Sequence, residues 1–410
     1  MLGSGFSLFT HVGMFSIIDK RTPNFTLFLS IMKKITAFLV LMFGIYFNLF
    51  SQKIVIKFKE NLKDTPSVSK AILRFNKDFA YSFTLDDATD DAFTTVFPLF
   101  KGGIIKPINL KTTGLFSTDG CGNDVPFRAG VAWNTAGQAG DIHGGDVAGF
   151  LTWRQLDTLL ENGWDVFNHS FSHKSRSSSP MKRVDYESEI DRNRLFVKQK
   201  TLKKVEMPVF VVPSGDTTYQ NIALDLGHKI VFDQPETYTG LGGFNVDGNL
   251  NLKRLKIHRQ LLEESISTVH QLEKVAEKSR NGTHFWYNEF THRVDNFKNT
   301  EGFNFFVFKN YFEKLAVAYG KKGSDRIWVA SLQEVFEYLV MRQSVVFTTK
   351  MVGKTVEVSF DLKQVPAWLK RRNLTLIVDS KNDFMDVEVP IGVIKTFKGF
   401  GNLKIINLSF

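Results

Sequence analysis

The sequence contains a single cysteine, Cys121, among its 410 residues. An intramolecular disulfide is therefore excluded, and an exported form of this chain would depend on its size and packing for stability. The net charge of +10 is spread along the chain without a basic block, and no known nucleic-acid-binding motif accompanies it. We therefore predict no nucleic-acid partner, and a basic periplasmic or secreted protein that meets anionic glycans fits the charge equally well.

The sequence also lacks a hydrophobic run long enough to span a membrane comfortably. "MKKITAFLVLMFGIYFNLFSQK", which begins at Met32, has two lysines and then an uncharged apolar run with signal-peptide proportions. We predict that residues 32–51 are a cleaved signal peptide, with an uncleaved anchor as the alternative, and that residues 1–31 lie upstream of the true start. The mature protein is predicted to be exported, periplasmic or secreted, without a stable membrane span.

Strand-like and helix-like stretches alternate from about residue 53 to residue 342. "DFAYSFTLDD", "WDVFNHS" and "MPVFVVPSG" are strand-like, whereas "TWRQLDTLLENG" and "SISTVHQLEKVAEKSRNG" have helical periodicity. This alternation predicts an α/β fold with a parallel sheet or a (β/α) barrel, in which residues at the C-terminal strand ends converge on one mouth. Five further strand-like stretches predict a small all-β sandwich over residues 343–410, packed on the barrel.

Chemically functional residues follow three of the predicted strands. Asp86 and Asp87 end the first strand, His169 and His173 follow a second in "NHSFSHKS", and His292 ends "NEFTH". Two histidines four residues apart on one turn point to the same side, and with one carboxylate they are a common ligand set for catalytic Zn²⁺. The second carboxylate could then accept a proton from water, and His292 could give one to a leaving group. The alternatives are a polar loop, acids at a helix N-terminus and a buried structural histidine.

Four motifs in this order, "SFTLDDA", "NHSFSH", "VVPSG" and "NEFTH", resemble the polysaccharide deacetylases with a NodB-homology domain. The resemblance covers roughly residues 75–342. It implies a distorted (β/α) barrel that removes acetyl groups from an N- or O-acetylated polysaccharide or oligosaccharide. It also implies one divalent metal ion, with Zn²⁺ preferred. By resemblance, the catalytic base is Asp86, the metal ligands are Asp87, His169 and His173, and the general acid is His292.

Two departures from the family pattern affect this site. The first motif ends in Ala88 instead of glycine, and Val211 stands where the family has an arginine paired with the catalytic aspartate. Loss of that cation should weaken the charged form of Asp86 unless another residue compensates. Three basic residues are candidates for this compensation: Lys174, Arg176 and Arg293.

Other residues have predicted roles around the site. The acid that orients His292 is predicted to be Asp325 or Asp233, each of which lies near a strand. Trp328 is predicted to form an apolar wall for the acetyl methyl group, with a core position as the alternative. Three residues are predicted to contact the substrate: Phe290, Trp328 and Pro213.

The long glycine-rich segment 103–150 is predicted to form a wall of the substrate cleft, because loops of this length in compact domains are usually functional or disordered. Within it, His143 is predicted to be an extra ligand or a solvated loop histidine. In the C-terminal segment, Trp368 could stack on a sugar, with ordinary packing as the alternative.

These observations predict a metal-dependent carbohydrate deacetylase over residues 52–342, in which metal-activated water attacks the acetyl carbonyl. The alternative is a glycan-binding protein on the same barrel with weak or no activity. The presence of Asp86 and His292 argues against it, because a pure binding protein needs neither a base nor an acid. "HSFSH" lacks the glutamate of the HExxH metalloprotease helix, so peptide hydrolysis of that type is disfavoured.

Overall fold

The computed structural model describes most of the chain after residue 51. The described residues are 52–136, 142–145, 147–234, 243–265, 270–295, 297 and 303–410, together with Met32 and Lys34. The predicted upstream segment and signal peptide lie outside them, apart from those two residues. Residues 54–410 form one compact unit. In the described part of the chain, no helix has the length and apolar character needed to cross a membrane.

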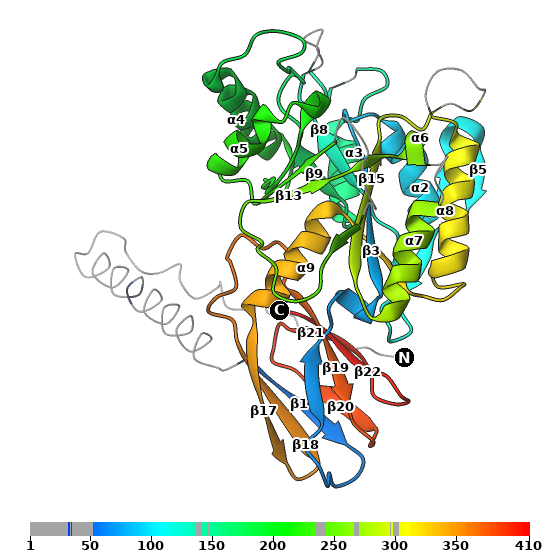
Figure 1. Cartoon of the computed structure of the whole chain (residues 1–410), viewed down its shortest axis with the longest axis vertical. Helices are drawn as coiled ribbons and strands as arrows, with labels where there is room; N and C mark the ends of the chain where they lie inside the picture. The colour runs from blue at the N-terminus through cyan, green and yellow to red at the C-terminus, as the bar shows by residue number, and fades with distance from the viewer. Residues whose placement is uncertain are drawn as a thin grey trace, which may run out of the picture. The chain divides into compact units, whose positions relative to one another are not determined.

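A nearly closed barrel of mainly parallel strands forms the centre of this unit (Figure 1). The order runs β15-β3-β8-β9-β10-β11-β13, β14 pairs with β15, and β16 pairs with the first half of β3. Only Arg259 separates β13 from β14, so this short segment joins the β11 edge to the β15 edge. The strands are β3 (Phe79–Leu85), β8 (Gly130–Trp133), β9 (Asp165–Asn168), β10 (Val209–Val211), β11 (Ile230–Asp233), β12 (Gly243–Asn245), β13 (Leu255–His258), β14 (Gln260–Leu261), β15 (Phe285–Thr291) and β16 (Ile327–Val329).

The barrel strands are buried on both faces, as parallel strands covered by helices are. All seven residues of β3 are buried. Ala80 belongs to the interior cluster with Phe167 and Trp286, whereas Tyr81 and Phe83 pack with residues of the surrounding helices. The predicted barrel fold is therefore confirmed, and side chains along each strand alternate between the barrel interior and the helix layer.

Helices cover the barrel on its outside, with α7 and α8 on one side and α4 and α5 on another (Figure 1). α3 begins with a capping box: Thr152 Oγ1 accepts from the N–H of Gln155, and Gln155 Oε1 accepts from the N–H of Thr152. The helices are α2 (Phe97–Lys101), α3 (Trp153–Glu161), α4 (Arg183–Lys200), α5 (Thr218–Asp225), α6 (Leu262–Ser265), α7 (His270–Lys278), α8 (Phe305–Tyr319) and α9 (Leu332–Ser344).

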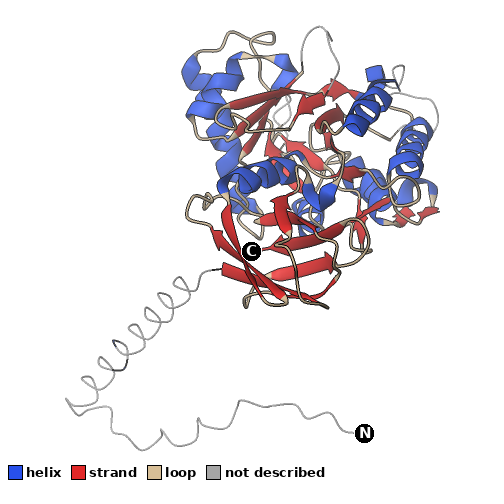
Figure 2. Cartoon of the chain, turned by 60° about the horizontal axis from the view of Figure 1, so that its bottom comes forward, coloured by secondary structure: helices blue, strands red, loops and turns tan. Residues whose placement is uncertain are grey.

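Two four-stranded sheets, β17-β18-β1-β20 and β2-β19-β22-β21, form a second body that we call the β unit. It contains strands and loops only (Figure 2). The sequence predicted it from residues 343–410 alone, but β1 and β2 come from the N-terminal side of the barrel, which begins at β3. The strands are β1 (Gln52–Phe58), β2 (Ser67–Lys70), β17 (Val346–Val352), β18 (Thr355–Asp361), β19 (Asn373–Asp379), β20 (Phe384–Glu388), β21 (Ile394–Lys398) and β22 (Lys404–Ser409).

Helix α9 lies between the barrel and the β unit (Figure 1) and is buried from Leu332 to Arg342. One hydrophobic cluster contains α9 residues, Trp286 of the barrel, and Ile56 and Leu374 of the β unit. The apolar core therefore continues past the predicted boundary at residue 343. We retain the division into a barrel and an accessory domain as a proposal, with the accessory part built from both ends of the chain.

A buried network of charges crosses the same interface. Arg371, in the loop after β18, bonds Asp165 at the start of β9 (Nη1–Oδ2, 2.9 Å) and Glu337 on α9 (Nη1–Oε2, 3.2 Å). Lys370 Nζ lies 2.8 Å from Asp165 Oδ1. Burial would raise the pKa of Asp165, but Arg371 and Lys370 outweigh it and hold that pKa well below its ordinary value. Asp165 is thus kept charged by cations of the β unit.

Replacing Arg371 by alanine should lower the free energy of unfolding by about 3 kcal/mol. The change leaves Glu337 without its cation, whereas Lys370 still faces Asp165, which places the loss at the lower end of the range for a broken buried pair. Arg372→Ala is the matched control, because the Arg372 side chain forms no ion pair in the described part of the chain, and it should cost less than about 0.5 kcal/mol. Urea unfolding of both variants checks this, and equal losses would contradict the proposed role of the network.

Candidate active site and metal centre

The register of β3 and β15 brings Asp86 and His292 together. The two strands pair in parallel with Leu85 opposite Thr291, so Asp86 and His292 follow at adjacent strand ends. The N–H of Asp86 donates to the carbonyl of Thr291 at 2.9 Å. Asp86 is buried, whereas His292 is exposed at the rim. The predicted base and the predicted acid therefore lie at the same end of the barrel.

The register of β9 and β10 places His169 beside Val211. Asn168 lies opposite Phe210, and the next residue, His169, has its Nδ1 2.9 Å from the carbonyl oxygen of Val211. A carbonyl oxygen only accepts, so Nδ1 carries the proton and Nε2 has a free lone pair. Nε2 is buried and has no hydrogen-bond partner in the described structure. An imidazole nitrogen left in this state is suited to a metal ion.

Asp87, His169 and His173 form a cluster whose ligand atoms all lie within 4.8 Å of one another. Asp87 Oδ1 is 3.7 Å from His169 Nε2 and 3.5 Å from His173 Nε2. Two ligands of a tetrahedral Zn²⁺, each about 2.1 Å from the ion, lie roughly 3.4 Å apart. Burial lowers the pKa of His169 to about 4 against the opposing effect of Asp86, so this imidazole is neutral at pH 7. The three residues therefore fit a single divalent ion.

The turns that carry these ligands have an unusual backbone. Asp87, Ala88 and His173 have φ values of 66°, 54° and 56°, in the left-handed region that residues other than glycine rarely adopt. Ala88, at the family's glycine position, is fully buried and is expected to store about 1 kcal/mol of strain. The strained positions surround the metal cluster, which indicates that the surrounding fold holds its ligands in place.

Helix α4 holds the turn that carries His169 and His173 through hydrogen bonds. Glu189 accepts hydrogen bonds from the N–H and the hydroxyl of Ser172, both at 2.7 Å. Asn193 Nδ2 donates to Asn168 Oδ1 at 2.8 Å, and that oxygen also accepts from the N–H of Ser170. Glu189, Asn193 and Asn168 are all buried. A polar face of α4 therefore fixes the shape of the "NHSFSH" turn.

Arg259 supplies the cation that Val211 does not. Its guanidinium binds Asp86 through two hydrogen bonds, Nη1–Oδ1 and Nη2–Oδ2, both 2.8 Å long. It also lies over the Phe290 ring, 4.2 Å from the ring centroid. Burial would raise the pKa of Asp86, but Arg259 outweighs it and holds that pKa below its ordinary value. Asp86 is therefore ionised although only 2% of its surface is exposed.

None of the three candidates for this cation, Lys174, Arg176 and Arg293, pairs with Asp86 in the described structure. Arg293, for example, pairs with Asp295. Sequence reasoning missed Arg259, although "RLKIHRQ" places it directly after a strand-like stretch. The rule that found the other site residues, which looks at C-terminal strand ends, would have found this one too.

The segment after Asp87 also holds the loop of His292. Thr89 Oγ1 donates to the carbonyl of His292 at 2.8 Å, and the N–H of Val294 donates to Asp91 Oδ2 at 2.7 Å. Burial raises the pKa of Asp91 to about 7. Thus one loop of "DDATDD" carries the predicted base and a metal ligand, and positions the backbone of the predicted acid.

Neither predicted orienting acid contacts His292 in the described structure. Asp325 precedes β16, at the opposite end of the barrel, and pairs with Lys77 (Nζ–Oδ2, 2.7 Å). Asp233 ends β11 and pairs with His258 at the end of β13. In β11 the neighbouring Phe232 belongs to the interior cluster, so Asp233 points to the outer side. Both assignments are therefore corrected.

The predicted substrate contacts lie in different places. Trp328 is 1% exposed and pairs with Ala80, early in β3, so it belongs to the core near the barrel base and not to an acetyl pocket. Pro213 opens the turn after β10, whose Ser214 lies beside the metal cluster. Phe290 is buried beneath Arg259 at the site. Direct contact of Pro213 and Phe290 with a substrate stays a prediction.

Segment 103–150 is not a single wall of the cleft. Its first part packs near the barrel base and the β unit, where Asn407 Nδ2 donates to the carbonyl of Asp119 at 2.8 Å. That part contains the hairpins β4 (Gly103–Ile105) with β5 (Leu110–Thr112), and β6 (Phe116–Thr118) with β7 (Asp124–Pro126). Only its later part reaches the mouth of the barrel.

In that later part, His143 supports a metal ligand indirectly. Its ring is buried and stacks on Phe150, with the centroids 3.8 Å apart. His143 Nδ1 is 2.8 Å from the carbonyl oxygen of Asn134, and Asn134 Nδ2 donates to Asp87 Oδ1 at 3.0 Å. His143 is therefore neither a solvated loop residue nor a member of the metal cluster.

Residues 77–231 match the sequence profile of the family described as polysaccharide deacetylase. The match covers less than half of the chain, and within it the chain is similar to the polysaccharide deacetylases. The resemblance predicted from four short motifs is thereby confirmed. No curated protein sequence matches the chain significantly.

Several solved deacetylase structures are distantly similar. Deacetylase PplD of Streptococcus pyogenes has 16% identity and a TM-score of 0.29, over 43% of this chain and 63% of that one. The family 4 carbohydrate esterase of Streptomyces lividans has 13% identity and a TM-score of 0.26, over 38% and 62%. Peptidoglycan deacetylase PdaC of Bacillus subtilis has 12% identity and a TM-score of 0.35, over 64% and 92%. The chain thus spans less than two thirds of the first two proteins, and scores this low carry no argument about substrate.

The metal cluster can be tested by elemental analysis. Metal-supplemented protein should hold about one divalent ion per chain, and His169→Ala should abolish binding because it removes the buried nitrogen that lacks a protein partner. His258→Ala is the matched control, because His258 is an exposed histidine that pairs with Asp233, outside the cluster. Retention of the ion in His169→Ala, or its loss in both variants, would contradict the assignment.

Asp91 should make stability depend on pH. The pKa of Asp91 is about 7 in the folded protein, above the ordinary value of 3.8, so ionised Asp91 destabilises the fold. This loss of stability grows between these two pH values and is constant above them. Asp91→Asn removes the titration and keeps an acceptor for Val294. The unfolding free energy of the variant, relative to the parent, should therefore rise by up to about 4 kcal/mol as the pH increases through this window. Urea unfolding at about pH 5 and pH 8 should capture roughly 2.5 kcal/mol of this rise, and a pH-independent difference would refute the assignment.

Proposed function

We propose that the chain is a metal-dependent hydrolase that removes acetyl groups from an acetylated polysaccharide or oligosaccharide. The observation that carries this proposal is the position of Asp86. It is buried, held ionised by Arg259, and beside a three-ligand cluster, with its Oδ2 3.9 Å from His169 Nε2. The ligands would be Asp87, His169 and His173, with Zn²⁺ as the preferred ion because two imidazoles and one carboxylate leave a position open. When bound, such an ion supplies polarisation of the acetyl carbonyl and activation of water.

Asp86 is the base in this proposal. The two hydrogen bonds from Arg259 fix the plane of its carboxylate, and they leave each oxygen with a further lone pair for a proton from the attacking water. Because Arg259 and Asp86 are both buried, bulk water does not screen their attraction. A carboxylate that is ionised and immobile in this way is ready to accept a proton without rearrangement.

His292 is the acid. It lies next to Asp86 at the adjacent strand end and is exposed at the rim, where the departing amine or alcohol of a long glycan would emerge. Its ring packs edge-on against Phe290, with the centroids 5.7 Å apart, and Thr89 and Asp91 hold its backbone loop. The imidazole is therefore oriented by packing and by its main chain, without a carboxylate on its ring in the described structure.

A glycan-binding protein without activity is the competing proposal. The buried Arg259–Asp86 pair argues against it, because burying two charges carries a large desolvation cost that a pure binding site would not require.

The substrate is expected outside the cytoplasm, in line with the predicted signal peptide. Comparing acetate release from N-acetylated and O-acetylated sugars distinguishes the two possible positions of the acetyl group.

The roles proposed for Asp87, Asp86 and His292 predict different losses of metal content and turnover in three variants. Asp87→Asn should lower both metal content and turnover, because it weakens a ligand. Asp86→Asn should keep the metal and lower turnover by ~10²–10⁴-fold, the usual contribution of a general base. His292→Ala should also keep the metal, and its loss should be larger for an acetamide than for an activated acetate ester, whose leaving group hardly needs a proton. Metal content and acetate release are measured on the same samples.

Two substitutions at Arg259 complete this test. Arg259→Gln should keep the metal and reduce turnover nearly as much as Asp86→Asn, because the buried carboxylate then loses its cation. Arg259→Lys should keep more activity than Arg259→Gln, since an ammonium keeps the positive charge but cannot form the bidentate hydrogen bonds of a guanidinium. Full activity in Asp86→Asn would mean that another residue is the base, and full activity in Arg259→Gln would mean that Asp86 does not need this cation. Equal metal loss in all variants would reduce these residues to a structural cluster.

A further inference from the structure

Two adjoining cavities lie at the base of the barrel, away from the candidate active site. Their volumes are about 700 and 650 Å³, and both are lined by His228, Lys229 and Trp368. The lining includes Asp165 and Pro208. Asp165 starts β9, Pro208 precedes β10, and His228 and Lys229 precede β11. The cavities therefore lie at the N-terminal ends of these strands, whereas the metal cluster follows the C-terminal strand ends. We call the two cavities together the basal groove.

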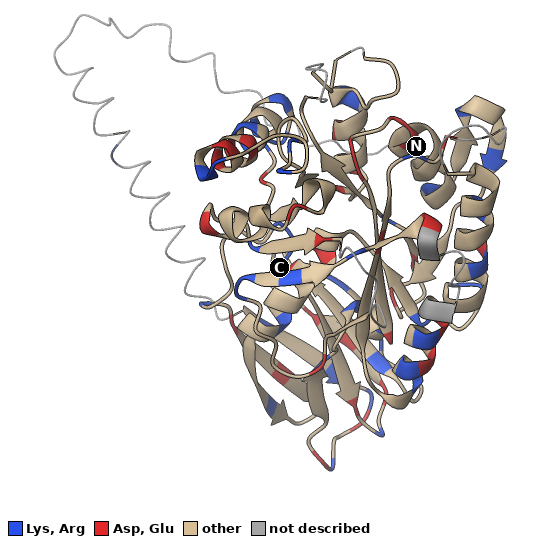
Figure 3. Cartoon of the chain, turned by 45° about the horizontal axis from the view of Figure 1, so that its top comes forward, with Lys and Arg blue, Asp and Glu red and all other residues tan. Residues whose placement is uncertain are grey.

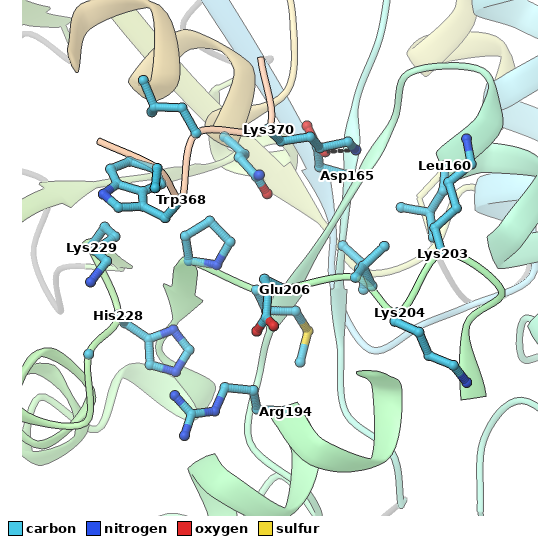
Figure 4. A pocket seen from close by; sticks show the side chains of 18 residues that line it. Leu160, Asp165, Arg194, Lys203, Lys204, Glu206, His228, Lys229, Trp368 and Lys370 are labelled. Atoms are coloured by element: carbon cyan, nitrogen blue, oxygen red, sulfur yellow. Dashed lines mark hydrogen bonds and ion pairs between the residues drawn. The ribbon is translucent and has the colours of Figure 1, made fainter. Parts of the chain in front are cut away.

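The basal groove carries uncompensated positive charge. Lysines and arginines are otherwise spread over the whole molecule (Figure 3). Figure 4 shows Lys229 beside Trp368 on one side of the larger cavity and Lys203 and Lys204 on the other. Lys253 lines the smaller cavity. None of these four ammonium groups pairs with a carboxylate in the described structure, and Lys204 Nζ instead donates to the carbonyl of a residue in α4.

The acids of the groove are already engaged. Asp165 is bonded by Arg371 and Lys370, and the exposed Glu206 pairs with Lys198. His228, in the floor, accepts a hydrogen bond from Asn168 at its Nε2, and burial lowers its pKa to about 3, so it is neutral. A ligand in the groove would therefore meet lysines whose charge is not cancelled locally.

Trp368 gives the groove an aromatic surface. Its ring is half-buried and stacks on Phe336 of α9, with centroids 5.9 Å apart and an interplanar angle of 18°. This contact fixes the orientation of the indole, and the rest of its surface lines both cavities. A rigid aromatic ring offers a large contact area at little entropic cost, and the apolar face of a sugar ring is a suitable partner.

We propose that the basal groove is a second binding site, for an oligosaccharide segment that carries carboxylate or sulfate groups. Sugar rings would pack on Trp368, and the anionic groups would lie near Lys229 and Lys203. A nucleic-acid strand is the less favoured occupant, because single strands are bound by several separate stacking rings, whereas Trp368 and Phe336 are the only Phe, Tyr or Trp residues in the described lining and they stack on each other. The site is independent of catalysis, so it can be tested whether or not the proposed function holds.

The test is calorimetric titration with a galacturonic acid hexamer, with cellohexaose as the neutral probe. The parent protein should bind the acidic hexamer, more weakly at about 0.15 M salt than at low salt because ions screen exposed charges, and should bind cellohexaose much more weakly. Lys229→Gln and Lys203→Gln should each reduce affinity about two- to fivefold, the range for an exposed charge contact. Trp368→Ala should reduce it about tenfold.

Lys314→Gln is the matched control, because Lys314 is an exposed lysine on α8 that lines neither cavity. It should leave binding unchanged, and all four variants should release acetate from a short acetylated substrate at the parental rate. If Trp368→Ala unfolds, the lysine variants still decide. The proposal is overturned if Lys314→Gln weakens binding as much as Lys229→Gln, if no groove variant weakens it, or if an oligo-dT strand binds the groove more tightly than the acidic hexamer.

Discussion

The buried ion pair between Arg259 and Asp86 is the interaction on which the candidate site depends. Arg259 stands between β13 and β14, the segment through which the barrel closes from β11 to β15, and Asp86 follows β3 on the other side of β15. The pair therefore links barrel closure to the placement of the proposed base. Two charges inside a protein are tolerated only with good geometry and full hydrogen bonding, so the pair also fixes how these strands end.

Most of the candidate site could be predicted from the sequence because its residues share a local signal. Asp86, Asp87, His169, His173 and His292 each follow a strand-like stretch, and parallel strands bring such positions to one mouth. Arg259 follows the same rule, but its role depends on a pairing partner 173 residues away in the sequence, and no local pattern encodes that distance. Proximity of this kind is decided by strand order, which short sequence motifs do not specify.

The misplaced residues have a common physical reason. The predictions for Trp328 and Asp325 do not consider which end of the strand each residue occupies, and one lies inside β16 and the other before it, at the barrel base. Asp233 does end a strand, but alternation turns it outward. The β unit shows the same limit at a larger scale. Its C-terminal strands were recognised by their pattern, and β1 and β2 were not assigned to it because their partners are far away along the chain.

The way the β unit is assembled has a consequence for how the chain matures. Val55 of β1 pairs with Glu388 of β20, so the first strand of the described chain completes its sheet with one of the last. During synthesis, β1 has no partner until its neighbours in the sheet, β18 and then β20, have emerged, and a loop of this size must close before either pairing contributes any stability. An unpaired strand edge is prone to association with other chains in the meantime. The β unit is therefore expected to form late, after the barrel whose base it covers.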